Sequence, residues 1–278
     1  MLKIIADSTC NLSPDLLARH QIPIAPIAIQ FGEQSYDEFL TIDRDLFYRK
    51  IEETGTIPTT SQPSPAWFAE LYRQAAREQA PVLVLTVTGK HSGTYQSAVL
   101  ARSMVPEADV EVFDSASISL GTGWMVLEAA RLSHAGRSRS AILRRLTTIR
   151  KHSHLYLTPS TLKYLQMSGR VGKLQGALAS LLNVKPIIIL KDGVLEAREN
   201  VRTRGKAIER LVSLAESAVG SAPIHMGVIH ARAPEEGREL LTKVTARLNC
   251  EEVMMEDLVP SLAVHGGPGV LGLAFYAD

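Results

Sequence analysis

Hydroxyl side chains gather where predicted strands give way to helices. Thr59–Ser61 precede a helix that Ser64 caps, with Pro65 at its first position, and Ser92-Gly93-Thr94 follow the apolar run "VLVLTV". A cap needs only one hydroxyl, so the first segment holds more of them than capping requires. Free backbone N–H groups at a helix start favour an anion, and the two segments are expected at the same edge of one sheet. Together these groups suit a carboxylate.

Two other segments of this kind leave alternatives open. "DSASISLGTGWM" begins with Asp114 and Ser115 and also holds Ser119, and it predicts either a tight turn with a helix cap or a ligand contact. Asp7 in "ADSTC" is either a catalytic carboxylate or an acceptor that braces the local backbone. We favour bracing, because a short acidic side chain at a strand end usually accepts from local backbone donors.

A histidine and an arginine stand beside glycines. His265 precedes Gly266-Gly267-Pro268-Gly269, a loop that would let the backbone approach a ligand closely and hold the imidazole on a constrained turn. Arg170 lies in "MSGRVGKLQGAL", where a helix is expected to break at Gly169-Arg170 and then resume with small and aliphatic residues. From the residues alone, both are either structural or part of a site.

Several function classes are disfavoured. The sequence has no phosphate-binding loop, no dinucleotide fingerprint, no nucleophile elbow and no metal-ligand spacing, so ATP binding or ester hydrolysis by this chain alone is not expected. The net charge of +1 provides no field for nucleic acid or an anionic membrane. The basic segment 138–154 is therefore expected to be a solvated helix. Cys10 and Cys250 are expected to be reduced thiols.

No apolar run approaches the roughly 20 residues of a membrane span, and "MLKIIADSTC" does not resemble a secretion leader, so a cytoplasmic protein without an integral membrane segment is expected. The fold class is α/β with two lobes. Alternating strands and helices predict an N-terminal parallel-sheet, Rossmann-like domain over residues 1–155. Residues 156–278 predict a mixed α+β domain that includes a hairpin at Asp192-Gly193, with the ligand between the lobes.

The ordered set "TTSQPSP", "SGTYQSA", "DSASISLGTG", "LKYLQMSGRVG", "KPIIILKDGVL" and "HGGPGVLGLAF" resembles the DegV family of bacterial fatty acid-binding proteins across nearly the whole chain. The resemblance implies a protein that holds one long-chain fatty acid between its lobes. It implies no catalysis by this chain alone, no cofactor and no metal. The implied partner is a dihydroxyacetone kinase-like, ATP-binding subunit of a fatty acid kinase, and the acyl phosphate product feeds phospholipid synthesis.

The resemblance also implies roles for particular residues. Thr60 and Ser92 would grip the acyl carboxylate, and the neighbouring ligand-binding positions are Ser61, Gly93, Thr94 and Gly266. His265 would orient the carboxylate, while Arg170 and Arg202 would support phosphoryl transfer; Arg204 is close enough to be the matching arginine instead of Arg202. The small residues and leucines of "GALASLLNV" (176–184) would wall an acyl tunnel.

Departures from the family pattern leave some positions open. Lys90 and His91 replace a serine-rich stretch and would add positive potential beside the pocket, while "HGGPG" has one glycine more than the usual form and "MSGR" replaces the commoner G-G-R. Two other functions compete with the kinase subunit. One is a fatty acid carrier or lipid sensor without a kinase, and the other is a stand-alone phosphoryl or acyl transferase.

Overall fold

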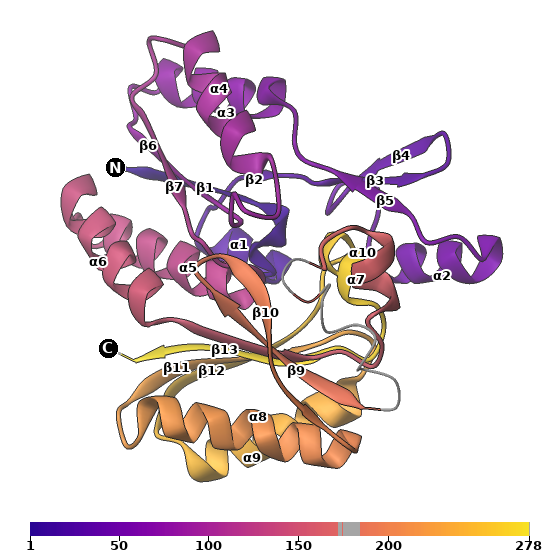
Figure 1. The fold of residues 1–278 in the computed structure, drawn as a ribbon. Helices are drawn as coiled ribbons and strands as arrows, with labels where there is room; N and C mark the ends of the chain where they lie inside the picture. Colours follow the sequence, from indigo (N-terminus) through magenta and orange to yellow (C-terminus); the bar gives the residue numbers. More distant parts are fainter. Residues whose placement is uncertain (172–173, 175–183, 278) are drawn as a thin grey trace. The chain divides into compact units, whose positions relative to one another are not determined.

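The structure, a computed structural model, describes residues 1–171, 174 and 184–277. The chain divides into two units (Figure 1). Unit 1 comprises residues 1–150 with 259–261, and unit 2 comprises residues 151–258 with 262–278. The expected division at residues 155 and 156 falls inside strand β8 (His154–Thr158). The return of the three-residue segment 259–261 to unit 1 has no counterpart in the sequence-based prediction.

Unit 1 is built on a four-stranded parallel sheet, as predicted. Its strands are β1 (Lys3–Asp7), β2 (Ile24–Ala25), β6 (Val82–Thr86) and β7 (Val110–Asp114), in the order β2-β1-β6-β7. After β1, the chain adds β2 on one side of β1 and then β6 on the other side. The strand order therefore reverses direction between β1 and β6, and the switch point lies at the carboxyl ends of these two strands. In open sheets of this type, ligands bind outside such a point.

Helices cover the parallel sheet on both faces (Figure 1). Helices α3 (Pro65–Arg77) and α4 (Thr94–Met104) pack Phe68, Tyr72 and Ala98 onto one face. Helix α5 (Leu120–His134) packs against β1 and β6 and is buried along most of its length. The remaining helices assigned mainly to unit 1 are η1 (Ser8–Cys10), α1 (Pro14–Arg19), α2 (Arg44–Thr54) and α6 (Arg139–His152).

A small antiparallel sheet in unit 1 corrects one sequence-based expectation. Pro26 follows β2 and interrupts strand pairing there, and β3 (Ala28–Phe31) pairs with β4 (Gln34–Asp37) instead. The third strand is β5 (Thr59–Ser61), which pairs with β3 where only a hydroxyl-rich loop was expected. Three residues are too few for a periodic pattern to predict a strand.

Unit 2 has a six-stranded mixed sheet in the order β10-β9-β8-β13-β11-β12. Strands β11 (Ile224–His230) and β12 (Cys250–Asp257) pair in parallel, and β13 (Leu271–Ala277) runs antiparallel between β11 and β8. The predicted hairpin is confirmed: β9 (Lys185–Lys191) and β10 (Val194–Val201) are joined by Asp192 and Gly193, whose φ angles are 50° and 78°. Positive φ at both positions is what a type I′ turn requires.

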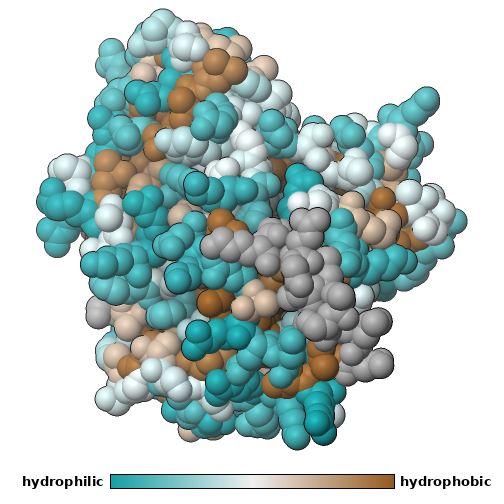
Figure 2. Space-filling view, in the orientation of Figure 1, coloured by the Kyte–Doolittle hydropathy of each residue, from teal (hydrophilic) through white to brown (hydrophobic). Residues whose placement is uncertain are grey.

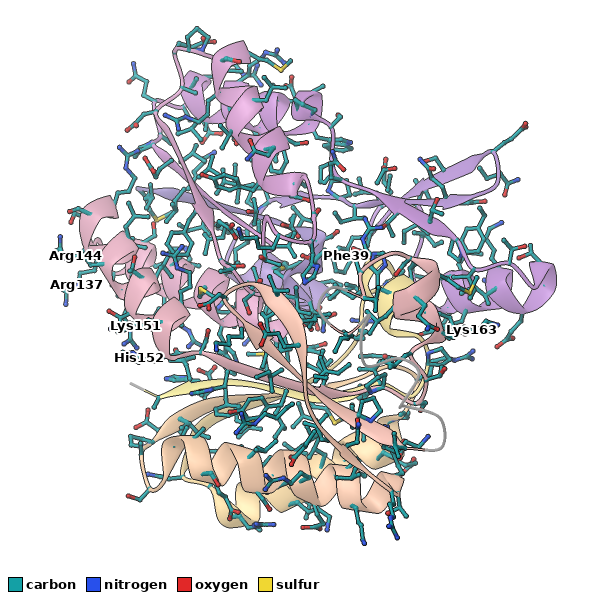
Figure 3. All side chains as sticks on the ribbon, in the orientation of Figure 1. Phe39, Arg137, Arg144, Lys151, His152 and Lys163 are labelled. Carbon is teal, nitrogen blue, oxygen red and sulfur yellow. The ribbon has the colours of Figure 1, made fainter. Side chains whose placement is uncertain are left out.

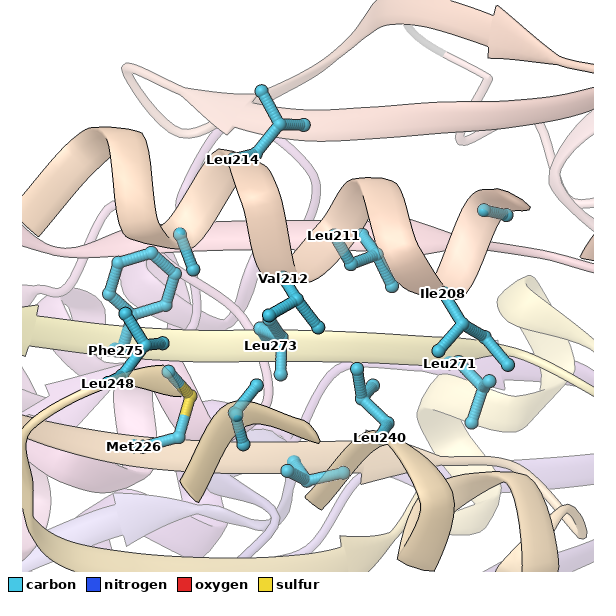
Figure 4. Packing of buried hydrophobic residues seen from close by; sticks show 14 of the residues in the cluster. Ile208, Leu211, Val212, Leu214, Met226, Leu240, Leu248, Leu271, Leu273 and Phe275 are labelled. Atoms are coloured by element: carbon cyan, nitrogen blue, oxygen red, sulfur yellow. The ribbon is translucent and has the colours of Figure 1, made fainter. Parts of the chain in front are cut away.

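Helices α8 (Arg204–Val219) and α9 (Pro234–Arg247) lie on this sheet and form the core of unit 2 (Figure 4). Their aliphatic side chains, among them Leu211 and Leu240, meet Met226, Leu273 and Phe275 of the strands. The described part of the unit also has two short helices, α7 (Lys163–Met167) and α10 (Pro260–Gly266), and the first residues of α10 belong to unit 1.

Helix α6 has the solvated basic face that its sequence predicts. Ile142, Leu146 and Ile149 are buried, whereas the charged side chains labelled in Figure 3, Arg144 and Lys151, extend outward and are exposed. Figure 2 shows hydrophobic surface over the upper helices of unit 1. Leu100 and Met104 of α4 are among the exposed apolar side chains. Scattered apolar side chains of this kind are normal on a protein surface. Among the described residues, none of the helices has the length and apolarity needed to cross a membrane.

Two glycines give a matched pair of stability predictions. A Cβ atom at Gly123 of α5 would lie 2.5 Å from the backbone oxygen of Cys10, whereas one at Gly205 of α8 would meet nothing within 4 Å. Gly123→Ala should therefore lower the free energy of unfolding by about 1–3 kcal/mol through overpacking. Gly205→Ala should raise it by roughly 0.5–1 kcal/mol, because alanine restricts the unfolded chain. Urea unfolding followed by circular dichroism measures both, and equal effects would contradict the packing at Gly123.

Candidate functional site

Asp7 holds the ends of two neighbouring strands together. Its carboxylate accepts hydrogen bonds from the backbone N–H and the hydroxyl of Thr9, at 2.9 and 2.5 Å, and from the N–H of Val87 just after β6, at 2.7 Å. The side chain is completely buried, and burial raises its pKa although these hydrogen bonds act in the opposite direction. The bracing role expected from the sequence is the one the structure shows.

Asp114 and the segment after it brace the loop that follows β6. The Asp114 carboxylate accepts from the N–H of Ala116 at 2.8 Å and of Gly89 at 3.2 Å, and the N–H of Thr88 donates to the oxygen of Ser117 at 2.8 Å. Ser115 is buried, and its hydroxyl lies 2.9 Å from that of Thr122. Of the two alternatives for this segment, the described contacts match the turn and bracing.

The loop so braced places Ser92 at the start of α4. The hydroxyl oxygen of Ser92 lies 2.8 Å from that of Thr94 and accepts from the Thr94 N–H at 3.3 Å. Thr94 is buried and Ser92 is half-buried. When the Thr94 hydroxyl donates, both lone pairs of the Ser92 oxygen are occupied, and the Ser92 proton is directed to a third group.

Thr60 occupies the middle of β5, opposite Ile29 of β3. Because side chains alternate along a strand, Thr60 lies on one face of this sheet, and Thr59 and Ser61 lie on the other. The Ser61 hydroxyl accepts a hydrogen bond from the side chain of Gln30 at 3.2 Å. The strand therefore separates three hydroxyls that look equivalent in the sequence.

The two hydroxyl segments lie against each other in unit 1. The side-chain nitrogen of Gln62, which follows β5, would be 2.8 Å from a Cβ atom at Gly93. Only glycine leaves Gln62 that position without a shift. Sequence analysis predicted that the segments share a sheet edge but did not single out Gln62, whose type alone gives no signal.

Arg170 follows the end of α7. Gly169 has a φ of 71°, the Arg170 N–H donates to the oxygen of Leu165 at 3.1 Å, and the Arg170 guanidinium donates to the oxygen of Ser168 at 2.6 Å. The predicted helix break at Gly169-Arg170 is thus confirmed. Most of the predicted tunnel wall, residues 176–183 with Ala177, Ala179 and the leucines, lies outside the described residues.

His265 lies in the last turn of helix α10 and not on the glycine turn that was expected to carry it. The glycines that follow lie close to other side chains of the protein. At Gly267 and Gly269, with φ angles of 75° and 80°, a Cβ atom would collide with the ring of Tyr164 and the hydroxyl of Ser160 respectively. A Cβ at Gly266 would lie 2.9 Å from Val270. The close approach that these glycines allow is to the protein's own side chains.

Arg204 and Arg202 have different surroundings. The Arg204 guanidinium binds both carboxylate oxygens of Glu236, at 2.8 and 3.2 Å, and donates to the backbone oxygens of Thr158 at 3.1 Å and Gly269 at 2.6 Å. Arg202 is exposed, as is Lys90. Arg204 therefore fixes the glycine turn after His265 inside unit 2, and Arg202 is the exposed member of the pair.

Within the ranges that the structure describes, no three histidine, cysteine or acidic side chains are grouped to hold a metal ion. The Cys10 thiol is buried, and burial raises its pKa. Within unit 1 the candidate residues are hydroxyls, and within unit 2 they are an imidazole and arginines.

A family model described as an uncharacterised protein of the DegV family matches residues 1–278. The chain belongs to the DegV family. Protein DegV of Bacillus subtilis is 32% identical over 276 residues, which are 99% of this chain and 98% of that protein. A DegV domain-containing protein of Deinococcus radiodurans is 32% identical over 277 residues, 98% of this chain and 97% of that protein.

Solved structures of similar proteins share the fold. A fatty acid-binding DegV family protein of Thermus thermophilus matches with a TM-score of 0.94 and 34% identity, covering 100% of this chain and 99% of that one. A stearic acid-binding protein of Eubacterium ventriosum matches with a TM-score of 0.92 and 29% identity, covering 100% and 98%. These matches confirm the two-part α/β fold class predicted from the sequence.

Neighbouring arginines provide a test of the glycine-turn contact. Arg204→Ala should lower the free energy of unfolding of the protein by about 1–3 kcal/mol, because it removes the hydrogen bonds that the oxygens of Thr158 and Gly269 accept from Arg204. The control Arg202→Ala removes an exposed cation and should change it by no more than about 0.5 kcal/mol. Urea unfolding measures both, and a cost at Arg202 as large as that at Arg204 would refute the assignment.

Proposed function

We propose that this chain binds a long-chain fatty acid and presents its carboxylate to a separate ATP-dependent kinase subunit. The observation that carries the proposal is the apposition of the Thr60 and Ser92 segments through Gln62 and Gly93. It is supported by the relatives from Thermus thermophilus and Bacillus subtilis, which are named as fatty acid-binding proteins. As a partner of an ATP-dependent enzyme, the protein would act in the cytoplasm.

Neutral donors suit the head group in this proposal. A buried carboxylate oxygen left without a donor costs about 1–3 kcal/mol or more, and the hydroxyls of Thr60 and Ser92 would supply those donors. Hydroxyls serve either protonation state of the acid and form no buried ion pair that would oppose its transfer. Ser61, Gly93, Thr94 and Gly266 are the neighbouring positions proposed to shape the site. Burial of the tail, at roughly 0.8 kcal/mol per methylene, would supply most of the affinity.

The charged residues of unit 2 would act in the transfer step. A carboxylate oxygen of the fatty acid attacks the γ-phosphorus of ATP held by the partner, a new carbon-oxygen-phosphorus linkage forms, and the bond to the β,γ-bridging oxygen breaks to release ADP. His265 would orient the carboxylate, and Arg170 and Arg202 would neutralise charge on the transferring phosphoryl group. The chain would thus support catalysis without carrying it out alone.

Native mass spectrometry of freshly purified protein, followed by solvent extraction, tests the binding function. We expect the mass of one long-chain fatty acid per chain, removed by the solvent and identified in the extract. A protein free of lipid that also fails to take up added oleate would reject the proposal. A fatty acid carrier or sensor without a kinase would bind oleate equally but give no acyl phosphate with any dihydroxyacetone kinase-like subunit. A stand-alone transferase would instead turn over without a partner.

Loss of a head-group donor should weaken binding. Ser92→Ala and Thr60→Val each remove one hydroxyl, and we expect the dissociation constant for oleate to rise about tenfold, the effect of about 1.4 kcal/mol. Thr59→Val is the matched control, because Thr59 lies on the opposite face of β5. Titration with a fluorescent fatty acid measures all three variants. Equal weakening by Thr59→Val would count against the specific role of Thr60.

The charged residues should separate binding from transfer. Arg170→Ala and His265→Ala should leave oleate affinity within about threefold of the original, since the tail supplies most of it, and should lower acyl phosphate formation by about a hundredfold or more. The control Arg137→Ala changes an exposed cation beside α6. Oleate binding and acyl phosphate are measured on the same samples. If binding fell in parallel with phosphorylation, the division of labour would be wrong.

A further inference from the structure

A buried carboxylate outside the proposed head-group site binds the start of helix α10. Glu38, which follows β4, is 1% exposed. Its two carboxylate oxygens accept hydrogen bonds from the backbone N–H and the hydroxyl of Ser261, each at 2.7 Å. Ser261 lies in the first turn of α10, where N–H groups have no acceptor within the helix. Glu38 therefore caps this helix from a segment 223 residues away in the chain.

Other contacts hold the same short segment. The N–H of Val259 donates to the side-chain oxygen of Asn11 at 2.7 Å, and Val259 and Ser261 are both buried in unit 1. Helix α10 then continues to His265, four residues after Ser261. Positions i and i+4 lie on the same face of a helix, one turn apart. The point at which Ser261 is held thus determines where α10 starts and, through one turn of helix, where the imidazole is carried.

Stability alone does not explain why a buried carboxylate, that of Glu38, caps this helix. Within the described part of the chain, the groups at the Glu38 carboxylate are hydroxyls, a backbone N–H and another acid, with no cation among them. Burying a carboxylate without a cation is costly, and a neutral side chain would also cap a helix. The next residue, Phe39, labelled in Figure 3, has a φ of 68°, which is rare for a bulky side chain. Strain beside a buried acid is typical of positions retained for function.

We propose that Glu38 is a positioning residue for His265, acting through Ser261 and the single turn of α10 between them. The proposal rests on the proposed function, in which His265 orients the acyl carboxylate. Glu38 does not need to touch the fatty acid for this role. It sets the position and orientation of the helix that carries the imidazole.

The surroundings of Glu38 make this contact sensitive to pH. The groups that face it are Ser261 of α10, Ser8 of η1, which donates to it, and the buried acid Asp7. Burial, reinforced by the charge of Asp7, raises the pKa of Glu38 to about 7. Above that pH both oxygens accept from Ser261, whereas protonation below it turns one oxygen into a donor. The Ser261 contact therefore changes across neutral pH, with the carboxylate form predominating on the alkaline side.

Nuclear magnetic resonance of the full chain tests the proposal. At pH 8, Glu38→Ala should shift the backbone amide signal of Ser261 and the ring C–H signals of His265, the latter assigned by their loss in His265→Ala. In the unsubstituted protein, the Ser261 amide should titrate with a midpoint near 7, as the raised pKa of Glu38 requires. Glu38→Gln, which keeps the size of the side chain, should abolish that midpoint.

Two further variants keep the test decisive. Glu33→Gln changes an exposed acid in the β3–β4 turn and should leave both sets of signals unchanged. Ser261→Ala removes one of the two hydrogen bonds and serves if Glu38→Ala does not fold. Movement of the Ser261 amide with no shift at His265 would overturn the proposal. Oleate binding by the unsubstituted protein is measured separately, so that its failure rejects the proposed function while the signals of His265 still report on Glu38.

Discussion

Buried backbone donors at the carboxyl edge of the parallel sheet need acceptors, and this requirement shapes unit 1. The chain leaves β1, β6 and β7 at that edge through irregular segments that water does not reach everywhere. Asp7 accepts from the buried N–H of Val87, and Asp114 accepts from the N–H of Gly89, which is exposed. These two acids hold the loop that leads to Ser92. The position of the proposed head-group donor therefore depends on carboxylates that accept hydrogen bonds from the protein's own backbone.

Acids and hydroxyls have separate tasks in this arrangement. Asp7 and Glu38 are buried, and their raised pKa values show that the protein offsets only part of the cost of burying charge there. A carboxylate ligand that met an ionised acid directly would be repelled. Under the proposed function, such a ligand instead meets Thr60 and Ser92, which donate without carrying charge. The carboxylate oxygens of Asp7 and Glu38 accept hydrogen bonds from backbone N–H groups and hydroxyls. Their charge is therefore used within the protein's own framework.

The sequence predicts most of the elements here but not the contacts that position the candidate site. Periodicity and the Asp192-Gly193 pair were sufficient for the parallel sheet, the helices that alternate with its strands, and the hairpin, but not for α10. They were insufficient for β5, which is three residues long and is held by β3. The contact of Gln62 with Gly93 and that of Glu38 with Ser261 join segments far apart in the chain. No local pattern marks a residue whose role depends on a partner 223 positions away.

The glycine motif after His265 is a second case in which a local sequence pattern does not reveal the contacts of a segment. Its sequence predicts a loop whose backbone a ligand can approach closely. In the structure, the missing side chains of Gly267 and Gly269 make room for Tyr164 and Ser160. The oxygen of Gly269 is bound by Arg204, and the start of α10 is bound by Glu38. The segment that carries His265 is thus held on both sides by charged residues of opposite sign. A short helix has too few internal hydrogen bonds to define its own position, so external contacts must do so. Under the proposal for Glu38, the position of the imidazole depends on Glu38 and Arg204, neither of which needs to touch the ligand.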